Sequence, residues 1–195
     1  AEYRTLFPAM IKDWRTNFNR GDFPFLFVQL ANFMEARPQP SESNWAATRE
    51  AQAEALKLPA TGMAVTIDVG EWNDIHPLNK SAVGERLALQ AFRIAYRDKT
   101  VQADGPVFKS MKIKNGKAVI RFAHTGSGLV ADGAAPEGFA IAGSDGKFVW
   151  AKALIDGDRV IVWHDDIRIP KHVRYAWADN PDKANLTTKE GLPAA

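Results

Sequence analysis

The chain has 195 residues, with 25 basic and 23 acidic side chains, a formal net charge of +2 and no cysteine. Apolar residues make up 46% and charged residues 25%, a composition typical of a globular protein with one large domain or two small ones. These values exclude an intrinsically disordered chain, a disulfide-stabilised miniprotein and a zinc site built on thiolates. No apolar run approaches the ~20 residues that cross a bilayer, and the charge is nearly balanced. We therefore expect no membrane span and no nucleic-acid partner.

Residues 1–103 alternate between helical and strand-like patterns. The apolar side chains from Tyr3 to Phe18 recur at three- and four-residue spacing, which predicts an amphipathic helix. Pro8 lies inside this stripe, so the helix should begin near Leu6 or bend at the proline. The other elements expected here are buried strands at 24–30 and 63–69 and helices at 44–58 and 79–97. This alternation predicts a parallel sheet covered on both faces.

From about residue 104 onward the apolar pattern has a period of two. Asn115-Gly116, Asp145-Gly146 and Asp156-Gly157 each separate two alternating runs. Such pairs indicate tight hairpins, because both central residues of a type I′ turn need a positive φ. With a further strand at 173–177, the second half should form an antiparallel β-sandwich or barrel. The sequence thus predicts an α/β domain at 1–103 and a β domain at 104–195.

The segment from Asp68 to Pro77 is the most informative one for chemistry. It follows a predicted parallel strand, and open α/β sheets place their ligand sites at that edge. His76 has three carboxylates shortly before it, on Asp68, Glu71 and Asp74. A histidine that acts as general base needs a partner that orients its ring, and an extended Asp-Ile-His segment points Asp74 and His76 to the same side. The alternative is a surface loop without catalytic function, and the single histidine makes a metal site here unexpected.

Two further polar residues are candidates for the same region. Gln29 ends the first predicted strand at the edge that carries the His76 loop. Arg49 lies on a polar helical strip that faces either this cleft or solvent. The chain offers no convincing nucleophile, because Ser127 lies in a Gly-Ser-Gly segment between β-like runs instead of at a strand-to-helix turn. Either the reaction is not covalent, or the nucleophile lies upstream of Ala1.

The segment GEWNDIHPLNKSAVGERLALQAF, at 70–92, resembles the histidine block of the sialate O-acetylesterases, serine esterases of the SGNH-hydrolase type. The resemblance continues in YRTLFPAMIKDWR and PFLFVQLANF before this block and in GFAIAGSDGKFVWA and VRYAWADNPDKANLTTKEGLPA after it. It therefore covers nearly the whole chain. It implies an α/β fold: the second half of a three-layer α/β/α SGNH-hydrolase domain followed by an antiparallel β-sandwich.

The resemblance also implies a partial active site without metal or organic cofactor. His76 takes the role of the base and Asp74 that of its carboxylate, with Glu71 in reserve because the superfamily's usual carboxylate position is occupied here by Asn73. Gln29 and Arg49 are assigned to substrate binding. In the family the nucleophilic serine and the oxyanion-hole residues precede Tyr3. We therefore expect this chain to pair with an N-terminal chain of the same precursor that carries the serine.

The resemblance implies O-acetylated sialic acid as the substrate and a periplasmic or extracellular location. Two alternatives stay open. The chain could act on acetylated xylan or another O-acetylated sugar, since the cleft side chains do not name the sugar. It could also be a carbohydrate-binding chain without catalytic activity, with the β domain binding the sugar and the α/β part acting as scaffold.

Overall fold

The structure, a computed structural model, describes residues 2–194. Its first helix, α1 (Tyr3–Phe18), begins three residues before the predicted start, and Pro8 lies within it. The first turn forms ahead of the proline, because the N–H groups of Thr5 and Leu6 both donate to the carbonyl of Glu2. Proline has a helical φ but no backbone N–H, so the helix continues through Pro8 with one intrahelical hydrogen bond fewer. Of the two alternatives that the sequence offers, the start near Leu6 is wrong, and a bend at Pro8 stays a prediction.

Two parallel strands form the centre of the N-terminal part. β1 (Phe25–Val28) pairs with β2 (Thr61–Ala64), and Leu26 lies opposite Gly62. Phe25 and Phe27 point to one face, where the ring of Phe7 from α1 meets them edge-on at 6.2 and 4.9 Å between centroids. The other face contacts α3 (Lys80–Ile94) so closely that a Cβ on Gly62 would lie 2.5 Å from Ile94 Cδ1. Helices thus pack against both faces of this small sheet.

The remaining elements of this part differ from expectation mainly at their ends. The predicted helix at 44–58 is present as α2 (Asn44–Ala53) followed by the 3₁₀ turn η1 (Glu54–Lys57). β2 is shorter than the strand expected at 63–69, because the hydroxyl of Thr66 donates to Gln29 O at 2.6 Å and the chain turns there. The start of α3 is as predicted, with the side chain of Asn79 accepting a hydrogen bond from Ala82 N.

The second half consists of antiparallel strands in three small sheets. The largest has the order β3-β4-β9-β8, formed by Val107–Lys114, Lys117–Ala123, Arg159–Trp163 and Lys152–Asp156. The second has the order β10-β6-β7, formed by His172–Tyr175, Phe139–Ala142 and Val149–Trp150. The third pairs β11 (Leu186–Thr188) with β5 (Leu129–Ala131).

The three predicted hairpin turns have three different outcomes. Asn115 and Gly116 have φ of 50° and 72° and form the two-residue turn between β3 and β4, as predicted. Asp156 instead pairs with Arg159 inside the β8–β9 ladder, so that turn is Gly157-Asp158, one residue later than expected. Asp145-Gly146 lies in a longer connection, 143–148, between β6 and β7. The pairing of each flanking ladder, and not the dipeptide alone, decides which residues turn.

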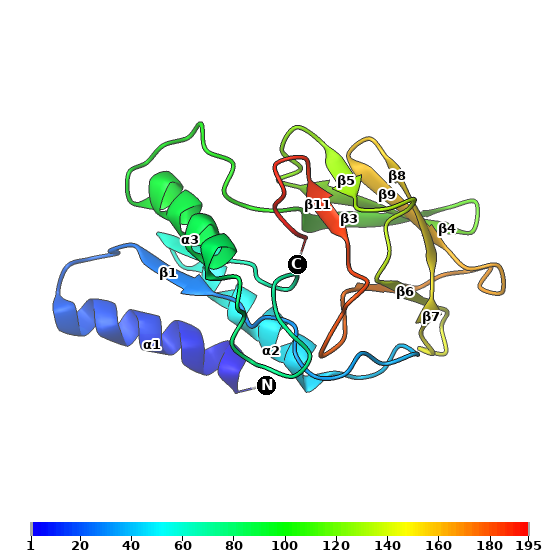
Figure 1. Ribbon diagram of the computed structural model, residues 1–195, viewed down its shortest axis with the longest axis horizontal. Helices are drawn as coiled ribbons and strands as arrows, with labels where there is room; N and C mark the ends of the chain where they lie inside the picture. Colours follow the sequence, from blue (N-terminus) through cyan, green and yellow to red (C-terminus); the bar gives the residue numbers. More distant parts are fainter. Residues whose placement is uncertain (1, 195) are drawn as a thin grey trace.

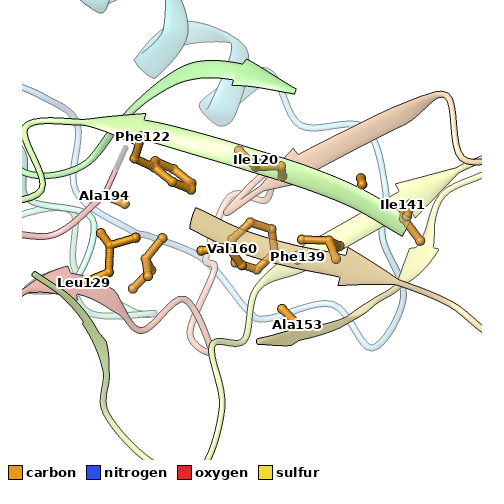
Figure 2. Close-up of a cluster of buried hydrophobic side chains, with 11 residues drawn as sticks. Ile120, Phe122, Leu129, Phe139, Ile141, Ala153, Val160 and Ala194 are labelled. Atoms are coloured by element: carbon orange, nitrogen blue, oxygen red, sulfur yellow. The ribbon is translucent and has the colours of Figure 1, made fainter. Parts of the chain in front are cut away.

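Two separate clusters of buried side chains lie on either side of residue 104. The cluster of the second half, shown in Figure 2, joins β4, β6 and β9 through Ile120, Phe139 and Val160. The cluster of the first half contains Ile11 of α1, Phe27 of β1 and Met63 of β2. Figure 1 shows the helices with β1 on one side of the molecule and the antiparallel strands on the other. The domain boundary at 103/104 stays a prediction. Within residues 2–194 no helix is both long and apolar enough to cross a membrane.

Candidate active site

His76 and Asp74 contact each other in the exposed loop between β2 and α3. One oxygen of Asp74, Oδ1, accepts a hydrogen bond from the backbone N–H of His76 at 2.8 Å and lies 3.1 Å from the ring nitrogen Nδ1. These bonds to the backbone N–H and then to the ring lower the pKa of Asp74, so the carboxylate is charged where a histidine titrates. The side chain of His76 is 80% exposed, and among residues 2–194 no hydrogen bond occupies its other ring nitrogen, so this nitrogen can exchange a proton with a reactant.

The other two carboxylates of this segment do not share this contact. Both oxygens of Asp68 accept hydrogen bonds from Arg86 of α3, at 2.6 and 2.7 Å. Among residues 2–194, no hydrogen bond or ion pair joins Glu71 to His76. The geometry therefore favours Asp74 over Glu71 as the partner of the ring.

The loop is attached at its first residues to the segment that follows β1. Gly70 N donates to Asn32 Oδ1 at 2.6 Å, and Met34 N donates to Trp72 O at 2.9 Å. A Cβ on Gly70 would lie 2.1 Å from Asn32 O, so a side chain at this position would force the two segments apart. Sequence patterns gave no signal for Asn32, because an asparagine after a strand looks like any loop residue.

Gln29 and Arg49 form a second pair, and both are 4% exposed. Gln29 Nε2 donates to Arg49 O at 3.3 Å, and the Arg49 guanidinium donates to the carbonyls of Ala176, Ala178 and Asp179 at 3.2, 2.5 and 3.4 Å. Burial lowers the pKa of Arg49 to about 10. The structure thus joins Arg49 to the C-terminal segment; a role of Gln29 and Arg49 in substrate binding stays a prediction.

This second pair lines a cavity of about 280 Å³ between α2, β2 and the C-terminal segment. His76 and Asp74 do not line it. Gln29 Oε1 and Trp177 Nε1, from two of its lining residues, are buried and have no hydrogen-bond partner among residues 2–194. An unpaired acceptor and an unpaired donor in one cavity suit a bound water or another small polar molecule.

The serine side chains of residues 2–194 offer His76 no nucleophile. The hydroxyl of Ser127 donates to Glu190 at 2.6 Å and that of Ser81 to Glu85 at 2.9 Å, so both serve local structure. No serine in the described part of the chain is bonded to His76. Within residues 2–194, histidine, aspartate and glutamate side chains form no cluster of three that could hold a metal ion.

No family model matches the chain, but it is similar to several known proteins, among them the following three. A sialate O-acetylesterase of Mus musculus is 34% identical over 126 residues, which cover 57% of this chain and 23% of that protein. The sialate O-acetylesterase of Homo sapiens is 30% identical over 137 residues, covering 63% and 26%. A carbohydrate acetylesterase of Xanthomonas citri, solved by crystallography, is 49% identical with a TM-score of 0.93, covering 99% of this chain and 45% of that one.

These matches confirm the resemblance that the histidine block indicates. The chain is a homologue of sialate O-acetylesterases and of a carbohydrate acetylesterase. It spans about a quarter of the length of the curated relatives and 45% of the solved acetylesterase chain.

Proposed function

We propose that this chain supplies the histidine half of a serine esterase that removes O-acetyl groups from sialic acid. The observation that carries the proposal is the contact between Asp74 Oδ1 and His76 Nδ1, in a loop that leaves the ring exposed. The sialate O-acetylesterases among the homologues support the substrate. Their longer chains support a nucleophile outside these 195 residues, on an N-terminal chain or segment of the same precursor.

In this mechanism the two nitrogens of His76 have different tasks. Nδ1 faces Asp74, whose negative charge fixes the ring and stabilises its protonated form. Nε2 takes the proton of the serine hydroxyl while the serine oxygen attacks the acetyl carbonyl. The same nitrogen then gives the proton to the sugar oxygen that leaves, and the acetyl-enzyme forms. Water hydrolyses this ester by the reverse sequence of proton transfers, so the cycle uses no metal or organic cofactor.

A second candidate substrate is acetylxylan or another O-acetylated sugar. The observation in its favour is that the carbohydrate acetylesterase of Xanthomonas citri is 49% identical to the chain, whereas the sialate O-acetylesterases are 30–34% identical. The reaction at His76 is the same for both substrates. The two candidate substrates differ only in the sugar that the side chains around the site would have to bind.

Replacing His76 tests the proposal. In the protein assembled with its N-terminal segment, we expect His76→Ala to lower kcat for acetate release from O-acetylated sialic acid by about 10²–10⁴-fold. The matched variant His172→Ala removes another exposed histidine, on β10, and should change kcat by less than about twofold. Residues 1–195 alone should release no acetate. Unchanged turnover in His76→Ala would refute the proposal, and sugar binding without any acetate release would favour the carbohydrate-binding alternative.

Substrate choice is measured separately. The wild-type protein is offered O-acetylated sialic acid and acetylated xylo-oligosaccharides under the same conditions, and kcat/KM is compared. We expect the sialic acid ester to be the better substrate. A higher kcat/KM on the xylo-oligosaccharides would show that sialic acid is not the preferred sugar. The proposed role of His76 would not be affected by that result.

A further inference from the structure

We propose that Asn180, in the C-terminal β part, is a positioning residue for the His76 loop and acts on it through Asn32. The inference rests on the proposed role of His76 as the base. The supporting observation is a continuous set of hydrogen bonds from Asn180 to Asn32 and from Asn32 to Gly70, at the start of the His76 loop. Asn180 lies more than a hundred residues after His76 in the sequence.

The side-chain amide of Asn180 bonds to two residues of the segment after β1. Asn180 is 7% exposed; its Oδ1 accepts a hydrogen bond from Asn32 Nδ2 at 2.9 Å, and its Nδ2 donates to Met34 O at 2.8 Å. Between these two residues, Phe33 N donates to Asp179 O at 3.2 Å. Residues 32–34 are therefore each bonded to the Asp179-Asn180 pair.

The same three-residue segment holds the beginning of the His76 loop. Asn32 uses the opposite end of its amide, Oδ1, to accept a hydrogen bond from Gly70 N at 2.6 Å. Met34 N donates to Trp72 O at 2.9 Å. One asparagine side chain thus orients a second one, and the second one anchors the loop that carries Asp74 and His76.

The segment 32–34 needs this support because the backbone of Met34 has an unfavourable conformation. Met34 has a φ of 73°, which side-chain-bearing residues rarely adopt, and it is 41% exposed, so burial does little to fix it. The hydrogen bonds to Asn180 and Trp72 compensate for that cost. Without Asn180, residues 32–34 lose two of their bonds to the β part, and Asn32 loses the contact that orients its amide toward Gly70.

The position of the loop matters because the ring of His76 is not held by packing. Its side chain is 80% exposed, and its partner Asp74 belongs to the same loop. The placement of the ring relative to a serine therefore depends on the anchored residues at Gly70 and Trp72. A displacement of about 1 Å in a catalytic group can cost about 10²-fold in rate.

Asn180→Ala tests the inference, with Asn185→Ala as the matched control. Asn185 also lies in the C-terminal segment and uses both ends of its amide, donating to Asp132 O and Ala135 O and accepting from Glu137 N, but it bonds away from the His76 loop. In Asn180→Ala we expect amide hydrogen exchange at Gly70 to accelerate at least about fivefold. We expect kcat to fall about tenfold while KM changes less than about threefold. Asn185→Ala should change neither exchange at Gly70 nor kcat by more than about twofold.

A double variant tests whether the two asparagines act as one unit. Asn32→Ala should resemble Asn180→Ala, and the combination should lower kcat no further than the stronger single change. If Asn180→Ala does not fold, Asn180→Ser, which keeps one hydroxyl in the site, replaces it in the same measurements. Unchanged exchange at Gly70 together with an unchanged kcat would overturn the inference. His76→Ala is measured in parallel: if it retains turnover, the proposed function fails, whereas exchange at Gly70 still reports on Asn180.

Discussion

At the scale of single residues, the contact between Asp74 and His76 is local, since one residue separates them. Asp74→Asn keeps an oxygen for the backbone N–H of His76 but removes the charge beside the ring. We expect kcat to fall by about 10²-fold or more, because the protonated ring loses its counter-charge. Glu71→Gln distinguishes the two candidate partners. A larger loss of kcat in Glu71→Gln than in Asp74→Asn would assign the ring to Glu71.

This locality explains which site residues the sequence could indicate. The extended Asp-Ile-His segment that the sequence predicts is absent, since the chain bends at Ile75 and His76. The Asp74–His76 contact is nevertheless local, because an aspartate side chain readily accepts a hydrogen bond from the backbone N–H two residues further on. The contacts of Arg49 do not follow from any local pattern, since its guanidinium meets carbonyls at 176–179, on a segment far along the chain. Asn180 and Asn32 are invisible for the same reason. A buried polar network is specified by tertiary packing, and each of its members looks like an ordinary loop residue in the sequence.

At the scale of secondary-structure elements, the predicted types agree with the structure better than the predicted ends. The apolar stripe of α1 and the cap at Asn79 are local signals, so that helix and the start of α3 could be predicted. The end of β2 could not, because it depends on the bond from Thr66 to the carbonyl of Gln29, the residue directly after β1. Asp156 likewise stays in its ladder because its partner is Arg159.

The Glu190 carboxylate joins the turn after β11 to the turn before β5, and it should make the unfolding free energy depend on pH. Ser127 donates both its hydroxyl and its backbone N–H to Glu190, and these bonds lower the pKa of Glu190 from 4.5 to about 2. Because the pKa of Glu190 is lower in the folded state, its charged carboxylate stabilises the fold at pH values above 4.5, the unfolded-state pKa. This stabilisation is lost as the pH falls through about 2. We expect Glu190→Gln to be less stable than wild type near pH 6 in urea unfolding, with a difference that shrinks toward pH 2.

Titration of the Glu190 carboxyl by NMR provides the control for this assignment. Ser127→Ala removes the hydroxyl donor but keeps the backbone N–H, so the pKa of Glu190 should rise above about 2 and stay below 4.5. An equal loss of stability from Glu190→Gln at pH 6 and pH 2 would show that charge at this position is not the cause.

At the scale of the whole molecule, the change of apolar period near residue 104 is visible in the sequence, but the strand order is not. Each half has its own buried cluster, and alternation along each strand suffices to predict which side chains face it. The order β3-β4-β9-β8 places β9 beside β4 although β5 to β8 intervene in the chain. Such pairings depend on which sheet edges meet during folding, and single-strand patterns do not encode them.

Arg49 connects the two halves, since its guanidinium extends from α2 to the carbonyls after β10. Arg49→Met keeps most of the side-chain volume but leaves those carbonyls without their donors. We expect a loss of about 2–4 kcal/mol in unfolding free energy and a Tm lower by roughly 5–15 °C. Arg4→Met, which removes an exposed ion pair with Glu50, should cost less than about 1 kcal/mol.

The same variant separates the two roles considered for Arg49. If the guanidinium joins the halves, Tm falls in Arg49→Met, and calorimetry of residues 1–195 detects the fall without any substrate. If it binds substrate instead, KM rises in the assembled esterase while Tm stays within the range of Arg4→Met. The first outcome is expected, because burial at 4% exposure and three carbonyl acceptors leave the guanidinium little capacity for a ligand.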